Sequence, residues 1–480
     1  MKISLYDKYE KMPVPAKASM WFVVCSVIQK GMAFITTPIF TRLLTSEEFG
    51  LVSVYNSWHS ILTMLLTLQL ATGVFNKAMI KYESRRDEYT SSMLFLTSCI
   101  TVSGYCIYFV FRNYFNAFFG LNTVLSSAIF LEILFSEAIS FWSIRHKFEY
   151  KYKSVIGYTL SSNILGTLVS LVLVLLFPQY RVYARVGGTL LVHIIIYSYL
   201  YIRIMKKGKR LIWKDAWRYA LGYNIPLIPH YLSHQVLSQA DRIMINNYCG
   251  SSYTAMYTIA YQIAMVLNII TTAICNSFTP WAYQKLKERD NKDIGLVTIK
   301  IELATGIICF FFTLFAPEFI YFMGGVAYQE AIWVVPPVCM SILFIMIYSL
   351  VSTVTFYFEK TKAIAVSSCV VAIANLILNA IFIPKFGMAA AGYTTLFCYA
   401  LFSAIHFALV KKTCKEEGVD SPFNSKVIWG ISLVFVLASI LCSVLYRITV
   451  VRYAVILLMG AIAIPFAYKN KKKIIMFIKK

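Results

Sequence analysis

Long apolar segments follow one another along almost the whole chain, and they constrain the fold more than any other feature. Of the 480 residues, 59% are hydrophobic and only 14% are charged, whereas soluble domains carry about 25% charged residues. A membrane-spanning helix needs roughly 20 apolar residues. The sequence therefore predicts an all-α integral membrane protein of about 14 transmembrane helices. We expect them at 18–41, 51–76, 90–111, 123–144, 155–177, 186–203, 219–247, 253–278, 301–322, 331–357, 363–383, 388–410, 427–446 and 453–468.

The positions of the basic residues predict the orientation of these helices. If the N-terminus is cytoplasmic, 36 of the 45 Lys and Arg residues fall in cytoplasmic segments and 8 fall on the other side. This asymmetry follows the positive-inside rule, so both termini are expected in the cytoplasm. The net charge of +23 is then a consequence of topology, and no nucleic-acid partner is expected.

Two internal similarities indicate a duplication. Arg42 precedes Gly50 by eight residues, and Arg242 precedes Gly250 by eight. The segment after Pro178 also resembles the segment after Pro384. Chance recurrence of short loops is the alternative. A duplication predicts two parallel six-helix lobes with the substrate path between them. The expected division is an N-terminal lobe at 1–205, a cytoplasmic linker at 206–217, a C-terminal lobe at 218–412, and an extra helix pair with a basic tail at 426–480.

The sequence lacks two common signatures of soluble enzymes and metal sites. It contains no G-x-x-x-x-G-K-[ST] phosphate-binding loop. The 11 cysteines occur singly and without metal-ligand spacing. His230 and His234 have the spacing of zinc ligands, but no acidic base lies between them. We therefore predict a non-enzymatic protein without cofactor or metal.

Polar residues inside the expected spans carry the functional information, because ionisable groups at membrane depth normally face a cavity or a partner. In span one, Lys30 and Thr37 belong to a polar stripe, and in span two Asn56 and His59 share one side. Lys30 is expected either to bind an anionic headgroup or to pair with an acidic residue of span four. For His59 alone, a packing role is the alternative.

Span seven is expected to be the most polar helix and to line the same cavity. His230, His234 and Asp241 lie on one side, and Arg242 lies on another. Pro226 and Pro229 should bend or unwind its inner part, as in the broken helices of transport sites. The Asp241-Arg242 pair is either a structural cap or an outer gate, and we assign Arg42, at the outer end of span one, to the gate as well.

Glu132 and Glu137 of span four are the main carboxylates at membrane depth. Either one is a candidate carrier of a coupling proton, because burial favours the protonated form of a carboxyl group. The alternative is an ion pair with Lys30 that holds the N-terminal lobe together.

Four stretches of the chain resemble one membrane protein family. They are KGMAFITTPIFTRLL at 30–44, FGLVSVYNSW at 49–58, PLIPHYLS at 226–233 with DRIMI at 241–245, and PKFGMAAAGYTTL at 384–396. They are similar to segments of polysaccharide flippases of the O-antigen (Wzx-like) type, in the multidrug/oligosaccharidyl-lipid/polysaccharide exporter superfamily. The resemblance covers both expected lobes.

The resemblance implies a function in cell-surface polysaccharide assembly. Such a protein would move undecaprenyl-diphosphate-linked oligosaccharides across the bacterial inner membrane by alternating access, driven by an ion gradient. Implied partners are the lipid-linked oligosaccharide, membrane lipid, and a polysaccharide polymerase and chain-length regulator. Two alternatives remain: a multidrug or cation antiporter of the same fold, and a membrane glycosyltransferase or polymerase of the same pathway.

Overall fold

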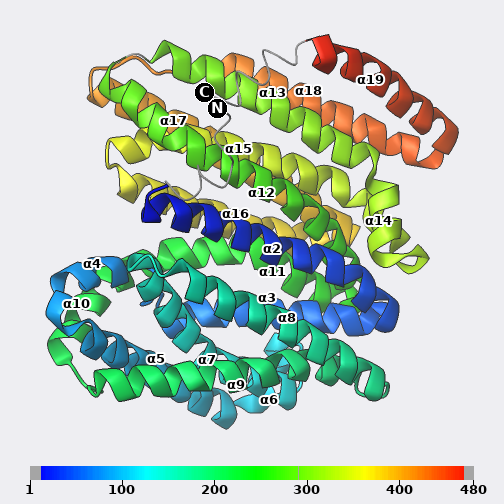
Figure 1. The fold of residues 1–480 in the computed structure, drawn as a ribbon. Coiled ribbons are helices and arrows are strands. Elements are labelled where there is room, and N and C mark those ends of the chain that lie inside the picture. Colours follow the sequence, from blue (N-terminus) through cyan, green and yellow to red (C-terminus); the bar gives the residue numbers. More distant parts are fainter. Residues whose placement is uncertain (1–11, 290, 470–480) are drawn as a thin grey trace, which may run out of the picture.

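The computed structural model describes residues 12–289 and 291–469, and within them the chain forms eighteen α-helices with short 3₁₀ turns (Figure 1). The first half contains α2 (Val14–Leu43), α3 (Ser46–Thr67), α4 (Phe75–Lys81), η1 (Glu83–Arg85), α5 (Arg86–Val110), α6 (Arg112–Phe119), α7 (Thr123–Phe148), α8 (Tyr152–Leu176) and α9 (Arg181–Gly208). The second half contains α10 (Lys214–Asn224), η2 (Ile225–Leu227), α11 (Ile228–Cys249), α12 (Ser251–Lys287), α13 (Lys292–Leu314), α14 (Ala316–Gly324), η3 (Val326–Trp333), α15 (Val335–Tyr357), α16 (Thr361–Phe386), α17 (Met388–Glu416), α18 (Ser425–Val444), η4 (Leu445–Arg447) and α19 (Thr449–Lys469).

The helices form two bundles with two helices between them. In Figure 1, α3 and α5 to α9 lie together in the lower part, α12 to α19 lie together in the upper part, and α2 and α11 run between these groups. We call the groups the N-terminal bundle (α3–α10) and the C-terminal bundle (α12–α19). One large hydrophobic core extends through both bundles. A second core, which includes Met79, Phe141 and Trp213, belongs to the N-terminal bundle and α10 alone.

Eleven of the described helices are long and apolar enough to cross a membrane, against the fourteen expected. The difference has a physical reason. α3 and α11 have 22 residues each, or about 33 Å at 1.5 Å per residue, but their many polar residues lower the mean hydropathy. The third is α19, of which only the first part has described side chains.

The prediction of one continuous span over 51–76 is wrong. α3 ends at Thr67, and the next two residues, Leu68 and Gln69, have φ values of 48° and 51°. The side chain of Asn224 holds this break together. Its amide nitrogen donates to the carbonyl oxygens of Leu68 (3.0 Å) and Gln69 (2.9 Å), and its oxygen accepts from the backbone N–H of Val74 (3.1 Å). The chain then resumes as the short helix α4.

The expected span seven is interrupted where its prolines predict a break. α10 ends at Asn224, a 3₁₀ turn contains Pro226, and α11 starts just before Pro229. Two further limits differ from the prediction. The segment expected at 301–322 divides into α13 and α14 immediately before Pro317, and α9 starts at Arg181 rather than at 186.

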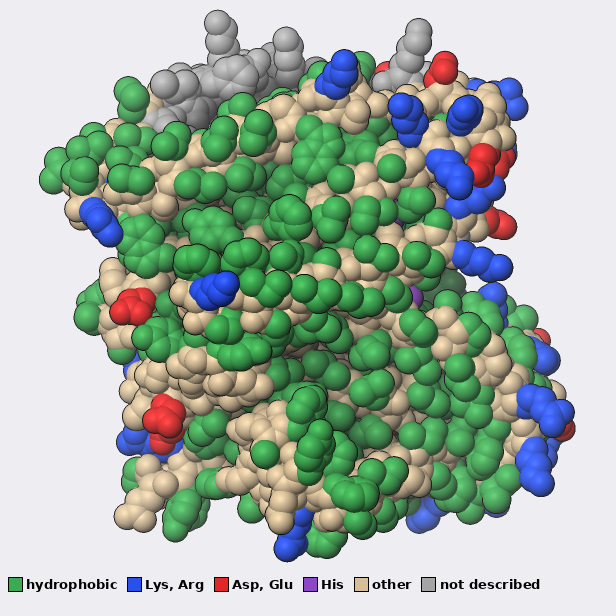
Figure 2. Space-filling view, turned by 180° about the vertical axis from the view of Figure 1, so that it is seen from behind, with side chains coloured by type: hydrophobic (Ala, Val, Ile, Leu, Met, Phe, Trp, Pro, Cys, Tyr) green, Lys and Arg blue, Asp and Glu red, His purple; other side chains and the backbone are tan. Residues whose placement is uncertain are grey.

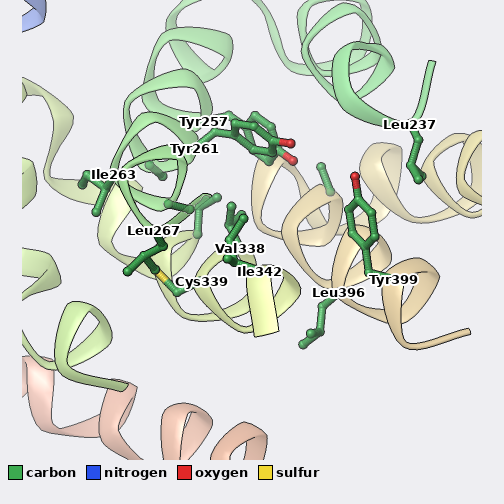
Figure 3. Packing of buried hydrophobic residues seen from close by; sticks show 14 of the residues in the cluster. Leu237, Tyr257, Tyr261, Ile263, Leu267, Val338, Cys339, Ile342, Leu396 and Tyr399 are labelled. Atoms are coloured by element: carbon green, nitrogen blue, oxygen red, sulfur yellow. The ribbon is translucent and has the colours of Figure 1, made fainter. Parts of the chain in front are cut away.

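The shared core contains three buried tyrosines near the centre of the C-terminal bundle. Figure 3 shows the phenolic oxygens of Tyr257 and Tyr261, from α12, and of Tyr399, from α17, pointing toward the same region. All three side chains are buried. Since buried phenols need hydrogen-bond partners, this region is polar although its surroundings are apolar. α11 passes along it and supplies Asp241.

Candidate functional site

A polar cavity of about 390 Å³ lies between the two bundles. It is bounded by α2 and α3, by the first turns of α9, and by α11 and α12. Apolar side chains (Phe40, Leu44 and Phe49) form one end of it. The lining residues are Ala33, Thr36, Thr37, Phe40, Leu44, Phe49, Val52, Ser53, Asn56, Ser57, Ser60, Arg185, Gln239, Arg242, Thr258, Tyr261, Gln262 and Met265.

Helices on both sides of the cavity contribute hydroxyl and amide groups. Thr37 of α2 donates to the side-chain oxygen of Gln262 on α12 (2.6 Å), and Ser57 of α3 donates to Gln239 on α11 (3.3 Å). Asn56 lines the cavity one residue before Ser57. Three of the predicted cavity residues, Thr37, Asn56 and Arg242, therefore line the cavity.

Two arginines are the cationic groups of the described lining. Arg242 of α11 donates to the Ser238 carbonyl (2.8 Å) and stands 4.4 Å from the Tyr261 ring centroid. Arg185 of α9 donates to Thr189 (2.9 Å) and stands 4.2 Å from the Phe40 ring centroid. Among the described residues, no carboxylate lies within 4.0 Å of either guanidinium. Both positive charges therefore remain available to an anion.

The sequence predicts Arg242 as a residue of the cavity-lining span, but it does not predict Arg185 as one. The prediction assigned Arg185 to an outer loop because span six was expected to begin at 186. Helix α9 instead begins at Arg181, and Arg185 lies one turn inside it. If the expected span at 186–203 is extended by five residues at its N-terminus, it includes Arg185, so the sequence is compatible with this position.

Asp241 lies next to Arg242 in the chain but does not enter the cavity lining. Its fully buried carboxylate accepts hydrogen bonds from Tyr257 (2.5 Å), Asn379 (2.6 Å) and Thr395 (2.8 Å). Asn379 also binds the side chains of Asn375 and Thr394. The carboxylate thus joins α11 to α12, α16 and α17 through oxygen-rich side chains, and these partners were not predicted from the sequence.

Glu132 and His59 lie together behind the cavity wall. Oε1 of Glu132 lies 3.0 Å from Nδ1 of His193. Its Oε2 accepts the hydroxyl of Tyr55 (2.7 Å) and lies 3.9 Å from Nε2 of His59. Glu137, also on α7, is 5% exposed, and its Oε2 has no hydrogen-bond partner among the described residues. The structure does not bring Glu132 and Glu137 to a common site.

Three further predicted residues, His230, His234 and Arg42, are not among the residues that line the cavity. His230 and His234 are on α11, nearer its first turn, and Ser233 between them contacts Cys369 (3.2 Å). Lys30 is on helix α2, but its side chain lies outside the described residues, so its pairing stays a prediction. Arg42 donates to the carbonyls of Pro38 (2.7 Å) and Phe322 (3.1 Å).

The bundles close against each other at the end where Arg42 lies. A Cβ atom added to Gly50 would come within 1.8 Å of the Ser251 carbonyl oxygen. In addition, Ser46 bonds Ser252 (3.1 Å) and Thr41 bonds the Met323 carbonyl (2.5 Å). We call this the closed end. Figure 2 shows Lys and Arg side chains gathered at the opposite end, with a hollow between the bundles there. We call this the basic end.

Comparison with known proteins places the chain in a family. Residues 16–285 match the model of the "Polysaccharide biosynthesis protein" family. The succinoglycan biosynthesis transport protein ExoT of Rhizobium meliloti is 23% identical over 287 residues, which is 58% of this chain and 55% of the relative.

Two solved structures share the fold. One is the lipid II flippase MurJ in an inward closed conformation (TM-score 0.69, 14% identity, 91% of this chain and 100% of that chain). The other is an inward-facing multidrug resistance MATE family transporter (TM-score 0.61, 12% identity, 84% and 99%). The chain therefore belongs to the polysaccharide biosynthesis protein family and has the fold of the multidrug/oligosaccharidyl-lipid/polysaccharide exporter superfamily.

Proposed function

We propose that the protein is a flippase that moves undecaprenyl-diphosphate-linked oligosaccharides across the bacterial inner membrane for cell-surface polysaccharide, such as the O-antigen of lipopolysaccharide. The observation that carries this proposal is the polar cavity between the bundles with two arginines that form no ion pair with a described carboxylate. The family match and the transport protein among its relatives support the same assignment.

The chemistry of this cargo fits the cavity. A lipid-linked oligosaccharide has an anionic diphosphate, a hydroxylated body and a tail that must stay in the lipid. Arginine binds phosphate oxygens through paired N–H donors, so Arg185 and Arg242 are the proposed diphosphate ligands, with Lys30 as a third candidate. The Ser, Thr, Asn and Gln side chains of the lining suit the sugars. For the tail we propose a lateral opening along α2, whose apolar segment is only 12% buried.

The proposed topology has fourteen spans in two six-helix lobes, 1–205 and 218–412, followed by the helix pair of 426–480. The eleven apolar helices supply eleven of these spans, and α3, α11 and α19 supply the other three. With the basic end in the cytoplasm, the hollow there faces the cytoplasmic leaflet, from which the cargo would enter. Ser91 and Ser92 of α5 bind the carbonyls of Arg210 and Leu211 (2.9 and 3.0 Å), so the linker 206–217 would move with the N-terminal lobe.

Alternating access requires the closed end to open. The contacts that would separate are those of Gly50 with Ser251, Ser46 with Ser252, and Thr41 with Met323. The break between α10 and α11 is the proposed hinge, because α10 belongs to the N-terminal core while α11 runs between the bundles and packs on both α16 and α3.

An ion gradient is the proposed source of energy. Asp241 is the best candidate to couple it, since its carboxylate contacts three helices of the C-terminal bundle and would change their packing when it binds a proton or a sodium ion. The oxygens of Asn375, Asn379, Thr394 and Thr395 nearby would suit a hard cation. Glu137, which is buried and whose Oε2 has no hydrogen-bond partner among the described residues, is the second candidate.

The alternative of a multidrug or cation antiporter receives less support. A cavity that takes up cationic drugs needs carboxylates on its surface, but the described lining contains two arginines and no aspartate or glutamate. No observation on the described residues supports the alternative of a glycosyltransferase or polymerase.

The test is the rate of transbilayer movement of a fluorescent lipid-linked oligosaccharide in proteoliposomes. We expect Arg185→Ala and Arg242→Ala each to lower the rate about 10-fold or more, because hydrogen bonds to charged groups contribute about 1.5–3 kcal/mol. Arg181→Ala, one turn earlier on the same helix and outside the cavity lining, is the matched control and should keep the parent rate. Parent rates in both cavity variants would refute the proposed function.

A further inference from the structure

A carboxylate flanked by two imidazoles lies directly behind the cavity wall. Glu132 of α7 lies 3.0 Å from Nδ1 of His193 on α9 and accepts the hydroxyl of Tyr55 on α3 at 2.7 Å. Nε2 of His59, on α3, points at the same carboxylate from 3.9 Å. This nitrogen is buried and has no hydrogen-bond partner among the described residues. The cluster thus contains an imidazole that can approach the carboxylate further when it gains a proton.

The cluster is connected to the cavity through two of its helices. Asn56 and Ser60, which line the cavity, adjoin Tyr55 and His59 on α3. On α9, Arg185 lies eight residues before His193, or about two turns. Glu132 contacts this same helix through His193 at 3.0 Å, and charges in a protein interior act over longer distances than in water. The charge of the cluster is therefore felt at one of the two cavity arginines.

The ionisable groups around the cluster are few. Tyr197 of α9 stacks on His193, with 4.7 Å between the ring centroids, and donates to Ser162 of α8. From α5, Tyr105 faces Ser127 of α7 at 3.5 Å. Tyrosines stay neutral in the range where histidine titrates. Histidine is the side chain whose charge ordinarily changes near neutral pH, and two imidazoles face Glu132.

We propose that Glu132, His59 and His193 form a proton-binding site whose charge sets how strongly the cavity holds an anionic headgroup. The inference rests on the proposed function and adds a regulation of its binding site. With both imidazoles neutral, the cluster carries the single negative charge of Glu132, which offsets Arg185. One proton makes the cluster neutral, and a second makes it positive.

The direction of the effect follows from these charges. As the pH falls, the wall behind Arg185 becomes more positive, and a diphosphate in the cavity is held more tightly. Because the side chains of Glu132 and His193 are only 12% and 14% exposed, the charge of the cluster is screened less than a surface charge. Headgroup binding should therefore strengthen with acidification, and it should weaken when both imidazoles are neutral.

The experiment measures binding to the purified full-length protein in nanodiscs between pH 5.5 and 8. The probe is polyprenyl-diphosphate-linked N-acetylglucosamine, because both of its phosphates are esterified and keep their charge over this range. We expect about fivefold tighter binding at pH 5.5 than at pH 8. The double variant His59→Gln/His193→Gln should bind with an affinity that does not change with pH. Glu132→Gln should bind more tightly than the parent at pH 8, since it lacks the opposing charge.

His146→Gln is the matched control, because this histidine lies on the same helix as Glu132 but bonds the Trp142 carbonyl (2.8 Å) outside the cluster. It should keep the fivefold dependence. The proposal is overturned if the parent binds equally well at every pH, or if the double variant keeps the parent profile. Absence of binding at any pH would instead remove the proposed function and this inference together. If the double variant does not fold, the single variant His59→Gln is measured instead. It should fold, because Nε2 of His59 makes no hydrogen bond among the described residues, and it should show a weaker pH dependence than the parent; an unchanged profile overturns the proposal.

Discussion

Asn224 connects the two places where membrane-embedded helices are interrupted. It is the last residue of α10, it is fully buried, and its side chain satisfies backbone groups of Leu68, Gln69 and Val74 in the break after α3. Such groups have no water to bind at membrane depth, so each would be left unpaired without this amide. One side chain therefore holds the ends of α3 and α10 in register.

Replacing Asn224 should destabilise the protein more than replacing another asparagine. We expect Asn224→Ala to lower the free energy of unfolding by about 2–4 kcal/mol, because several buried polar groups lose their partners. Asn163→Ala is the control, since Asn163 bonds only the Thr159 carbonyl of its own helix (2.7 Å) among the described residues. Thermal unfolding of the purified proteins in detergent measures the effect. Equal melting temperatures for the two variants would contradict it.

The sequence allowed some residues of the cavity to be predicted and not others. Thr37, Asn56 and Arg242 were found because polar residues at helical spacing in an apolar segment indicate a face that avoids lipid. Arg185 was missed because helix ends cannot be located to within one turn from hydropathy. The partners of Glu132 and Asp241 come from other helices, 61 and 138 positions away for His193 and Asn379, and one sequence does not contain that pairing.

At the scale of helices, the closed end depends on the close approach of α3 and α12. Gly50 lies so near Ser251 that a methyl group would overlap the Ser251 backbone. The two copies of the first sequence similarity, around Gly50 and around Gly250, therefore meet in space, where the start of one bundle touches the start of the other. Glycine is required here by the distance between the helices rather than by its backbone freedom.

Enlarging Gly50 should prevent this closure. Cysteines introduced at Ser46 and Ser252, whose oxygens are 3.1 Å apart, should form a disulfide readily while Gly50 is present. With Cys249→Ser as background, we expect Gly50→Ala to reduce the yield of this disulfide about 10-fold, which corresponds to ~1.4 kcal/mol. Gly157→Ala, with no atom within 4 Å of the added methyl group, should leave the yield unchanged. A high yield in both backgrounds would show that α3 and α12 can shift apart and still close.

The limits of the helices were predictable only where local chemistry sets them. Pro226 and Pro229 end one helix and start the next by removing backbone donors, so the break in span seven could be predicted. The end of α3 could not, because the apolar segment continues to residue 76 and the break is stabilised by Asn224, 156 positions from Leu68. Tertiary hydrogen bonds at this site override the local apolar pattern.

At the scale of the whole molecule, the basic side chains gather at one end and the bundles contact each other at the opposite end. Lys and Arg gather at the basic end, where the bundles are separated by the hollow in Figure 2, and the inter-bundle contacts lie at the closed end. If the basic end is cytoplasmic, this hollow faces the side on which lipid-linked oligosaccharides would be loaded. The orientation of the chain thus decides the direction of transport.

Two lysines at opposite ends of the molecule allow this orientation to be tested. Lys209 follows α9 at the basic end, and Lys385 is near the end of α16. Cysteines introduced at these positions, in a chain whose exposed native cysteines are replaced, should react differently with a membrane-impermeant maleimide. We expect labelling at 385 in intact cells and at 209 only after permeabilisation, because the positive-inside rule retains the basic end in the cytoplasm. The reverse pattern would invert the topology, and the cavity would then face the side from which the cargo should leave.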